Sequence, residues 1–339
     1  MKILLVQLSF LGDTILSTPV IAGLRLIYPD SELSVLTTKV AAALFAEDPL
    51  VEKVIIYDKK NSDKGIAKLV QKAMEIKDQK FDKVYSLHRS YRTAVLLFLS
   101  RIRERVGFRD ANFNFLYTDS RQKKMNSHAA VRNLSLLYDD FEKFNISKDE
   151  FKSDLRLFEP SKENLSQRVK DITRDFIVMA PGSAWKTKQW HWQGYLKVAQ
   201  YYMQKHIKII LIGGSDDIAA CRQICEKAGN SDPVVDFSGQ VSIPETMYIV
   251  KNAKLLICND SMVLHMASAF KTTCVAVFCA TSPKFGFGPW LNPDAKVVED
   301  EKLDCKPCRP HGSNHCPEKT RACMQFPAGK VIQACEEIL

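Results

Sequence analysis

Short apolar runs alternate with amphipathic stretches along most of the chain. Residues 2–8 form an apolar run, a polar turn follows at 9–13, and apolar positions then recur at helical spacing up to residue 27. The same alternation predicts strands at 2–8, 33–37, 52–57, 82–87 and 105–108, and again at 175–180, 207–213, 233–236, 254–258 and 273–278. This spacing is typical of right-handed βαβ units with parallel strands, so the pattern predicts an α/β protein.

Length and polarity divide the pattern into two domains. A chain of 339 residues that is 46% hydrophobic can bury two cores, and a polar segment at 142–154 separates the two groups of strands. We predict domains at 1–160 and 161–325, a linker within 155–170, and a terminal helix at 326–339 that packs back on the first domain. The absence of a long apolar run and of a signal-peptide cleavage site predicts a cytoplasmic protein.

Polar side chains follow three of the predicted strands. Asp13 stands at the first helix start, the loop 181–190 carries two lysines with Ser183 and Thr187, and Asp260, Ser261 and His265 follow the strand at 254–258. Ligands of open α/β sheets bind beyond the carboxyl ends of strands, where helix N-termini attract anions. The loop is therefore a candidate phosphate site. Alternatively, the acidic and hydroxyl residues only cap helices, and His265 is a core histidine.

Five ordered motifs carry a family resemblance. They are the segments at 11–20, 180–190, 237–239, 259–265 and 281–290. Together they resemble glycosyltransferase family 9, the ADP-heptose:lipopolysaccharide heptosyltransferases, and lie closest to the heptosyltransferase II branch. The resemblance implies a GT-B fold, in which two Rossmann-like domains with parallel sheets face each other across a cleft. It places the acceptor on the first domain and the nucleotide sugar on the second.

The resemblance and the local chemistry assign candidate roles. Asp13 would be the general base, and Lys188 would stabilise the departing diphosphate. The donor would contact Ser183, Thr187, Asp217, Val241, Asp260, Ser261, Met262 and His265, and the acceptor would contact Gly12, Arg89 and Arg92. Asp217 follows a predicted strand, where an acidic residue often holds a ribose, although a helix cap explains it equally well. A helix start should lower the pKa of Asp13, which weakens it as a base unless its surroundings oppose that effect.

Four residues depart from the family pattern near the expected donor pocket. Met262 replaces a small residue, Lys271 replaces the commoner glycine, and Cys279 with Ala280 replaces a Gly-Pro pair. These differences bear on the identity of the sugar more than on the fold.

The net charge of +9 indicates an anionic partner. Basic residues concentrate in the first domain at 88–92 and 101–105, and at Arg109, Arg121, Lys123 and Lys124. Such a cluster fits a lipid A–Kdo acceptor and peripheral contact with the inner face of the inner membrane. It also fits a merely solvated surface. Nucleic acid is not expected, because no nucleic-acid-binding motif accompanies the charge.

Ten cysteines are present, and four of them cluster near the C-terminus. Cys305, Cys308, Cys316 and Cys323 have a spacing that permits structural zinc, although the second pair is more widely spaced than in common zinc sites. The remaining cysteines lie in apolar patterns as small hydrophobes. No cofactor or catalytic metal is expected, because a lysine and helix ends can carry the diphosphate charge.

The sequence thus predicts an inverting, metal-independent transfer of heptose from ADP-heptose to the lipopolysaccharide inner core. Two alternatives stay open. A same-fold transferase could use another nucleotide sugar or glycan, which the residues Met262 and Cys279 allow. A non-catalytic nucleotide-sugar-binding protein would keep the site without turnover, and the presence of both Asp13 and Lys188 argues against it.

Overall fold

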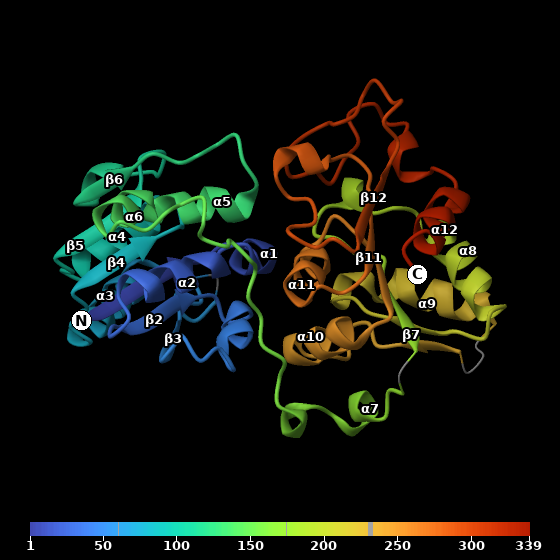
Figure 1. Cartoon of the computed structure of the whole chain (residues 1–339), viewed down its shortest axis with the longest axis horizontal. Coiled ribbons are helices and arrows are strands. Elements are labelled where there is room, and N and C mark those ends of the chain that lie inside the picture. The colour runs from blue at the N-terminus through green and yellow to red at the C-terminus, as the bar shows by residue number, and fades with distance from the viewer. Residues whose placement is uncertain (60, 174, 230–232) are drawn as a thin grey trace. The chain divides into compact units, whose positions relative to one another are not determined.

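The computed structural model describes all residues except 60, 174 and 230–232, and it divides into two compact units (Figure 1). The first unit is Met1–Phe158 and the second is Glu159–Leu339, so the division falls two residues before the predicted boundary. Each unit contains one six-stranded sheet in which all paired strands run parallel. None of the helices in the described residues is long and apolar enough to span a membrane.

The first sheet has the strand order β3-β2-β1-β4-β5-β6. Its strands are β1 (Lys2–Gln7), β2 (Glu32–Thr37), β3 (Lys53–Ile56), β4 (Lys83–Ser86), β5 (Glu104–Phe108) and β6 (Asp119–Arg121). In the central strand β1 every residue after Lys2 is buried, and Leu5 pairs with Val35 on one side and with Tyr85 on the other. A run that is apolar on both faces is what a sheet covered on both sides requires.

The helices of the first unit cover both faces of this sheet. They are α1 (Leu11–Ile15), α2 (Thr18–Ile27), α3 (Ile66–Asp78), α4 (Tyr91–Leu99), α5 (Ala129–Leu134) and α6 (Tyr138–Lys143), with short 3₁₀ turns η1 (Ala41–Phe45), η2 (Asn114–Leu116) and η3 (Ser135–Leu137). Because β2 and β5 lie on opposite sides of the β1–β4 pair, right-handed crossovers place α2 and α4 on opposite faces. Accordingly α3 packs with α4, and α2 packs with α5.

The second sheet has the order β12-β11-β10-β7-β8-β9. Its strands are β7 (Phe176–Ala180), β8 (Lys208–Leu211), β9 (Val234–Asp236), β10 (Leu255–Asn259), β11 (Cys274–Phe278) and β12 (Ala295–Glu299). Its helices are α7 (Gln167–Lys170), α8 (Trp192–Met203), α9 (Ile218–Ala228), α10 (Ile243–Asn252), α11 (Met262–Phe270) and α12 (Ala328–Glu336), and its 3₁₀ turns are η4 (Lys162–Asn164), η5 (Lys186–Lys188), η6 (Ser215–Asp217), η7 (Pro283–Phe285) and η8 (Ala322–Met324).

Both sheets follow the Rossmann strand order. If the strands of each unit are counted from its own start, both orders read 3-2-1-4-5-6. The predicted α/β fold with two Rossmann-like parallel sheets is confirmed. The order in which strands are added to the sheet reverses between β1 and β4 in the first sheet and between β7 and β10 in the second. Ligands of open α/β sheets bind at such switch points.

The terminal helix α12 buries its apolar side within the second unit. It packs on α8, β11 and β12, and Val331 and Cys335 are fully buried. The Glu336 carboxylate accepts hydrogen bonds from the Tyr202 hydroxyl at 3.1 Å and from Lys205 Nζ at 2.7 Å. Packing of residues 326–339 on the first domain concerns the relative placement of the two units and stays a prediction.

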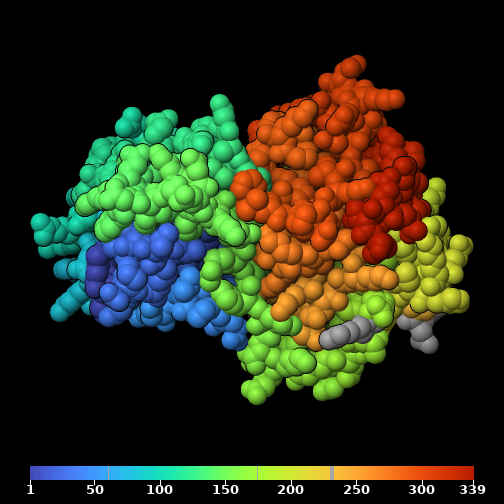
Figure 2. Space-filling view, viewed as in Figure 1, coloured from blue at the N-terminus to red at the C-terminus, as the bar shows by residue number. Residues whose placement is uncertain are grey.

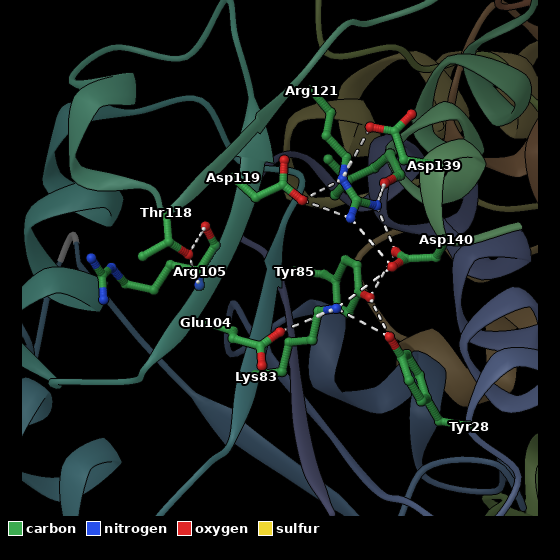
Figure 3. Close-up of polar contacts among 11 residues, drawn as sticks. Tyr28, Lys83, Tyr85, Glu104, Arg105, Thr118, Asp119, Arg121, Asp139 and Asp140 are labelled. Carbon is green, nitrogen blue, oxygen red and sulfur yellow. Dashed lines mark hydrogen bonds and ion pairs between the residues drawn. The ribbon is translucent and has the colours of Figure 1, made fainter. Parts of the chain in front are cut away.

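A buried network of charges joins β4, β6 and α6 in the first unit (Figure 3). The Asp140 carboxylate accepts hydrogen bonds from the Tyr85 hydroxyl at 2.8 Å and from Arg121 Nη1 at 2.5 Å. Lys83 Nζ lies 3.5 Å from Asp140 and donates to the Tyr28 hydroxyl at 3.1 Å. Burial by itself raises the pKa of Asp140, but the hydrogen bonds and charge of Arg121, with Tyr85 and Lys83, outweigh it and hold that pKa below 3.8.

Candidate active site

Predicted site residues gather at the carboxyl ends of the central strands in both units. In the first unit, β1 leads into the turn that carries Asp13, and β4 leads to Arg89. In the second unit, β7 leads into the loop 181–190, and β10 leads to Asp260. These are the two switch points, so the positions agree with the general location of ligand sites in such sheets.

Asp13 lies inside the first turn of α1 and does not cap it. The N-cap is Phe10, whose extended backbone (φ −64°, ψ 159°) precedes the helix, while Gly12 and Asp13 belong to the helix itself. The negative charge of Asp13 raises the pKa of both Lys123 and Arg132, against the effect of burial. A carboxylate and two cations from distant parts of the sequence therefore interact at this end of the sheet.

The surroundings of Lys123 disfavour the charged form of its side chain. Burial lowers its pKa to about 8, and repulsion by Arg89 and Arg132 acts in the same direction, whereas Asp110 and Asp13 oppose the shift. Its Nζ lies 4.9 Å from the centre of the Phe108 ring. A partly desolvated ammonium gains strongly from an anionic ligand, because the ligand supplies the countercharge that burial removes.

The two arginines predicted to contact the acceptor differ in their surroundings. The Arg89 side chain is 52% exposed and donates from Nη1 to Asp110 Oδ2 at 2.7 Å. The Arg92 guanidinium is used within the unit: Nε donates to the Tyr57 hydroxyl at 2.7 Å, and Nη2 donates to the backbone oxygens of residues 63 and 65, both at 2.8 Å. Arg92 therefore anchors the segment after β3, and Arg89 is the more accessible of the two.

In the second unit, Asn259 fixes the candidate phosphate loop against β10. Its side chain is fully buried, and Nδ2 donates to the carbonyl oxygen of Pro181 at 2.6 Å. Its Oδ1 accepts a hydrogen bond from the backbone N–H of Trp190 at 3.0 Å. Both ends of the loop are thereby held to the strand that precedes Asp260.

The structure brings Lys188, Asp260 and Ser183 together. Lys188 Nζ lies 2.8 Å from Asp260 Oδ2, and the two side chains are only 12% and 4% exposed. The Thr281 hydroxyl donates to the same carboxylate oxygen at 2.7 Å, and the Ser183 hydroxyl donates to the Asp260 backbone oxygen at 3.0 Å. The residue predicted to bind phosphate and the residue predicted to bind sugar hydroxyls thus form one buried ion pair.

The Thr187 hydroxyl forms hydrogen bonds with the backbone of another loop, at Ser313. Its buried hydroxyl donates to the Ser313 carbonyl at 2.9 Å and accepts from the Ser313 N–H at 2.8 Å. The adjacent Gly312 has φ of +73°, and a Cβ there would lie 2.9 Å from Cγ of Lys188. The absence of a side chain at Gly312 therefore leaves room for the Lys188 side chain, and residues 312–313 lie next to Lys188.

The remaining predicted donor residues lie around the same sheet edge. Ser261 is the N-cap of α11 by backbone position, but its hydroxyl makes no capping hydrogen bond; Met262 follows it, partly exposed, and His265 is buried one turn later. Asp217 accepts a hydrogen bond from the Gly214 N–H at 2.9 Å, which is a capping contact, and burial raises its pKa. Val241 lies in the turn before α10.

Asp217 also packs against the candidate phosphate loop, residues 181–190. A Cβ at Gly182 would lie 2.1 Å from Cγ of Asp217, so only glycine fits between the two segments. The carboxylate thus contacts the start of the loop 181–190 as well as its own helix.

Comparison with known proteins agrees with this arrangement. A sequence profile of glycosyltransferase family 9 (heptosyltransferase) matches residues 69–318, which is most of the chain. The chain belongs to glycosyltransferase family 9. The lipooligosaccharide heptosyltransferase 2 of Campylobacter jejuni is 25% identical to this glycosyltransferase over 346 residues, covering 100% of this chain and 98% of its own length.

Solved structures show the same fold. The structure of Escherichia coli ADP-heptose lipopolysaccharide heptosyltransferase II has a TM-score of 0.80 at 20% identity and covers 100% of this chain and 98% of its own. The structure of Escherichia coli heptosyltransferase WaaC with ADP has a TM-score of 0.77 at 16% identity, with 100% of each chain covered. The predicted GT-B class and the predicted glycosyltransferase activity are confirmed.

Sequence reasoning about this glycosyltransferase missed several residues of the site. Arg132 and Gly312 lie far from any predicted motif, and no local signal marks them. Lys123 was counted only among the basic residues of the first domain. Asn259 had a usable signal, because a polar residue that ends a buried strand directly before Asp260 must find hydrogen-bond partners.

The four clustered cysteines line one small cavity beside this site. Cys305, Cys308, Cys316 and Cys323 surround it together with Thr187 and other residues of the same loops. All ten cysteines lie in the part of the chain that the structure describes, and none of them forms a disulfide. Within the described residues, no three His, Cys, Asp or Glu side chains are placed to hold one metal ion.

Proposed function

We propose that this glycosyltransferase transfers heptose from ADP-heptose to the inner core of lipopolysaccharide, with an anionic acceptor of the lipid A–Kdo type. Its relatives include lipooligosaccharide and lipopolysaccharide heptosyltransferases, one of them an ADP-heptose enzyme, which supports this donor and lipopolysaccharide as the acceptor. The observation that carries the proposal is the electrostatic interaction of Asp13 with Lys123 and Arg132 at the carboxyl end of β1. A general base that interacts with partly buried cations suits transfer to the hydroxyl of an anionic sugar.

On the acceptor side, Lys123, Arg132 and the accessible Arg89 would bind phosphate or carboxylate groups of the acceptor. These cations repel one another in the free protein, because Arg89 lowers the pKa of both of the others. An anionic acceptor relieves the repulsion and so binds where Asp13 can reach its hydroxyl. An anionic acceptor that neutralises these cations would also remove charge that weakens Asp13 as a base, so that Asp13 would accept the acceptor proton more readily.

On the donor side, Lys188 would pair with the diphosphate of ADP-heptose. An entering diphosphate takes Lys188 as its counterion and leaves the Asp260 carboxylate free to accept hydrogen bonds from sugar hydroxyls. The Ser183 hydroxyl, which lies on the same loop, supplies a further donor. Because Lys188 stabilises the leaving diphosphate, the step needs no divalent metal.

The reaction would proceed by a single displacement. The acceptor oxygen forms a bond to the anomeric carbon on the side opposite the diphosphate, and the bond from that carbon to the ADP oxygen breaks. The acceptor proton passes to Asp13, and ADP departs with the bonding electron pair. One displacement inverts the anomeric configuration.

Replacement of Asp13 with asparagine tests this assignment. We expect Asp13→Asn to lower the rate of ADP release by roughly 10² to 10⁴-fold, while calorimetry shows donor affinity within about twofold of wild type. Asp110→Asn is the matched control, because Asp110 also raises the pKa of Lys123 and its carboxylate pairs with the exposed Arg89. Transfer by Asp13→Asn at more than a few per cent of the wild-type rate would show that Asp13 is not the base.

A different nucleotide sugar is the second candidate, and Met262 at the start of α11 favours it because the side chain is partly exposed there. A panel of ADP-heptose, ADP-glucose, UDP-glucose and UDP-N-acetylglucosamine, with Kdo-lipid A and a chelator present, separates the candidates. Release from ADP-heptose alone supports heptose and metal independence together. Release from another donor would move the assignment to that sugar. With this acceptor, the enzyme would work in the cytoplasm in peripheral contact with the inner membrane.

A further inference from the structure

Large apolar side chains are exposed mainly on the first unit. Among the described residues, only Leu291 and Leu339 of the exposed large hydrophobic residues belong to the second unit. Eight in the first unit come from α3, α4 and the turn at η2, and we call them the apolar face: Ile66, Val70, Met74, Tyr91, Phe98, Leu99, Phe113 and Phe115. Because α4 packs against both α3 and η2, the three elements that carry these side chains are neighbours in the unit.

Helix α3 is apolar on two sides. Leu69 and Ala73 are buried against the sheet, as expected for a helix that covers a core. Ile66, Val70 and Met74 recur every four residues on its outer side and are 79%, 44% and 51% exposed. A helix that only covers a sheet has polar residues on its outer side, so this second stripe is not explained by the fold of the unit.

Aromatic rings extend the apolar face beyond α4. The Tyr91 and Phe113 ring centroids are 5.9 Å apart, and those of Phe113 and Phe115 are 5.5 Å apart. Phe115 is 75% exposed. Phe113 has φ of +59°, a left-handed conformation that is strained for a bulky residue. The turn thus keeps a strained backbone while its rings project together into solvent.

The segment that carries the apolar face is rich in cations, and several exposed cations are close in sequence to its residues. Residues 64–116 contain twelve Lys and Arg against five Asp and Glu, a net charge of +7 in a chain whose total is +9. Lys64, Lys68, Arg101, Arg103 and Arg109 are exposed, and none of them forms an ion pair with a described acidic residue. Three of the five acidic residues are already paired within the unit, namely Glu75, Glu104 and Asp110.

We propose that the apolar face docks this unit on an anionic lipid bilayer, with the rings and aliphatic side chains in the interface and the exposed cations of this segment on lipid phosphates. Exposed aromatic rings favour the level of the lipid headgroups, and lysines and arginines are attracted by anionic lipids. In Figure 2, segments coloured light blue to teal lie at the surface of the first unit. The inference rests on the proposed function, since a lipid-linked acceptor gives the contact its purpose.

Vesicle co-sedimentation of the full chain tests the proposal without donor or acceptor. We expect binding to vesicles that contain phosphatidylglycerol, weakening with added salt, and little binding to phosphatidylcholine alone. The double variant Ile66→Ser with Phe115→Ser should bind at least about tenfold more weakly. Both side chains are largely exposed, so the variant should keep the wild-type melting temperature and circular dichroism spectrum. The matched control is Leu26→Ser, which is 53% exposed on α2, the helix on the opposite face of the sheet.

The outcomes separate this inference from the proposed function. Equal binding by the double variant and wild type, or equal loss in Leu26→Ser, would overturn the docking surface whatever the transfer activity. A wild-type dimer in light scattering that the double variant converts to monomer, without a change in vesicle binding, would assign the face to a second copy and also overturn it. Loss of vesicle binding with unchanged turnover of a detergent-dispersed acceptor would support the surface and leave the chemistry intact.

Discussion

Replacing Lys123 with methionine should stabilise the free protein at neutral pH while it removes transfer activity. Burial, with repulsion by Arg89 and Arg132, lowers the pKa of Lys123 from 10.5 to about 8. At about 1.36 kcal/mol for each tenfold change in proton affinity, keeping the ammonium charged in the folded protein costs roughly 3 kcal/mol. Methionine loses the cation–π contact with Phe108, worth about 0.5–1 kcal/mol, so the net gain is about 2 kcal/mol.

The gain should depend on pH with a definite sign. Because the pKa of Lys123 is lower in the folded protein than in the unfolded chain, unfolding takes up a proton between about pH 8 and 10.5. Wild-type stability therefore rises relative to the variant across this interval, and the difference between them should disappear above 10.5. Urea denaturation of both proteins, followed by circular dichroism at neutral pH and near pH 10.5, measures the two limits.

Lys124→Met provides the matched control. Lys124 is the exposed neighbour of Lys123 in the sequence, so its replacement should change the free energy of unfolding by less than about 0.5 kcal/mol. Transfer should fall in Lys123→Met, through weaker acceptor binding, and persist in Lys124→Met. If Lys123→Met is less stable than wild type at neutral pH, or if its advantage does not change with pH, then the surroundings of Lys123 do not disfavour its charged form and the reasoning fails.

The buried ion pair and the buried network give three further predictions. Lys188→Met should destabilise the protein by about 3 kcal/mol in urea denaturation, because it strands the Asp260 carboxylate. Lys188→Met should also lose donor binding in calorimetry. Lys186 is exposed, so Lys186→Met should keep both the wild-type stability and the wild-type donor affinity. Normal donor affinity in Lys188→Met would show that Lys188 does not belong to the donor site. Asp140→Asn should cost about 1.5–3 kcal/mol, because Arg121 loses a buried charged hydrogen-bond partner but keeps Asp119 at 2.7 Å, and a cost below about 0.5 kcal/mol would contradict the assigned pairing. The pKa of Asp140 lies below 3.8, so its stabilisation is present above that pH and should be lost as the pH falls further; this part of the acid transition should be missing in the variant.

Local pattern predicted the strands that carry the site and the edge strands β3 and β9, but it missed the edge strands β6 and β12. The run that ends at Asn259 is buried on both faces, and a break from apolar to polar residues marks its end clearly. The strand β6 has three polar residues, and four of the five residues of β12 are only partly buried, so neither has the continuous apolar run of a central strand. The strands β6 and β12 each lie at the edge of a sheet. An edge strand is formed by pairing with a single neighbour and does not need to be buried on both faces.

Sequence alone determined the fold class, the candidate base and the phosphate loop, because hydrophobic period, turn residues and motif order are local properties of the chain. Tertiary structure decided which charges meet. Lys188 pairs with Asp260 because β7 and β10 are neighbours, and Asp13 interacts with Lys123 and Arg132 because the chain returns to the end of β1 after β6. Such neighbours depend on strand order and on the packing of long-range loops, and no spacing along the chain encodes the distance between them.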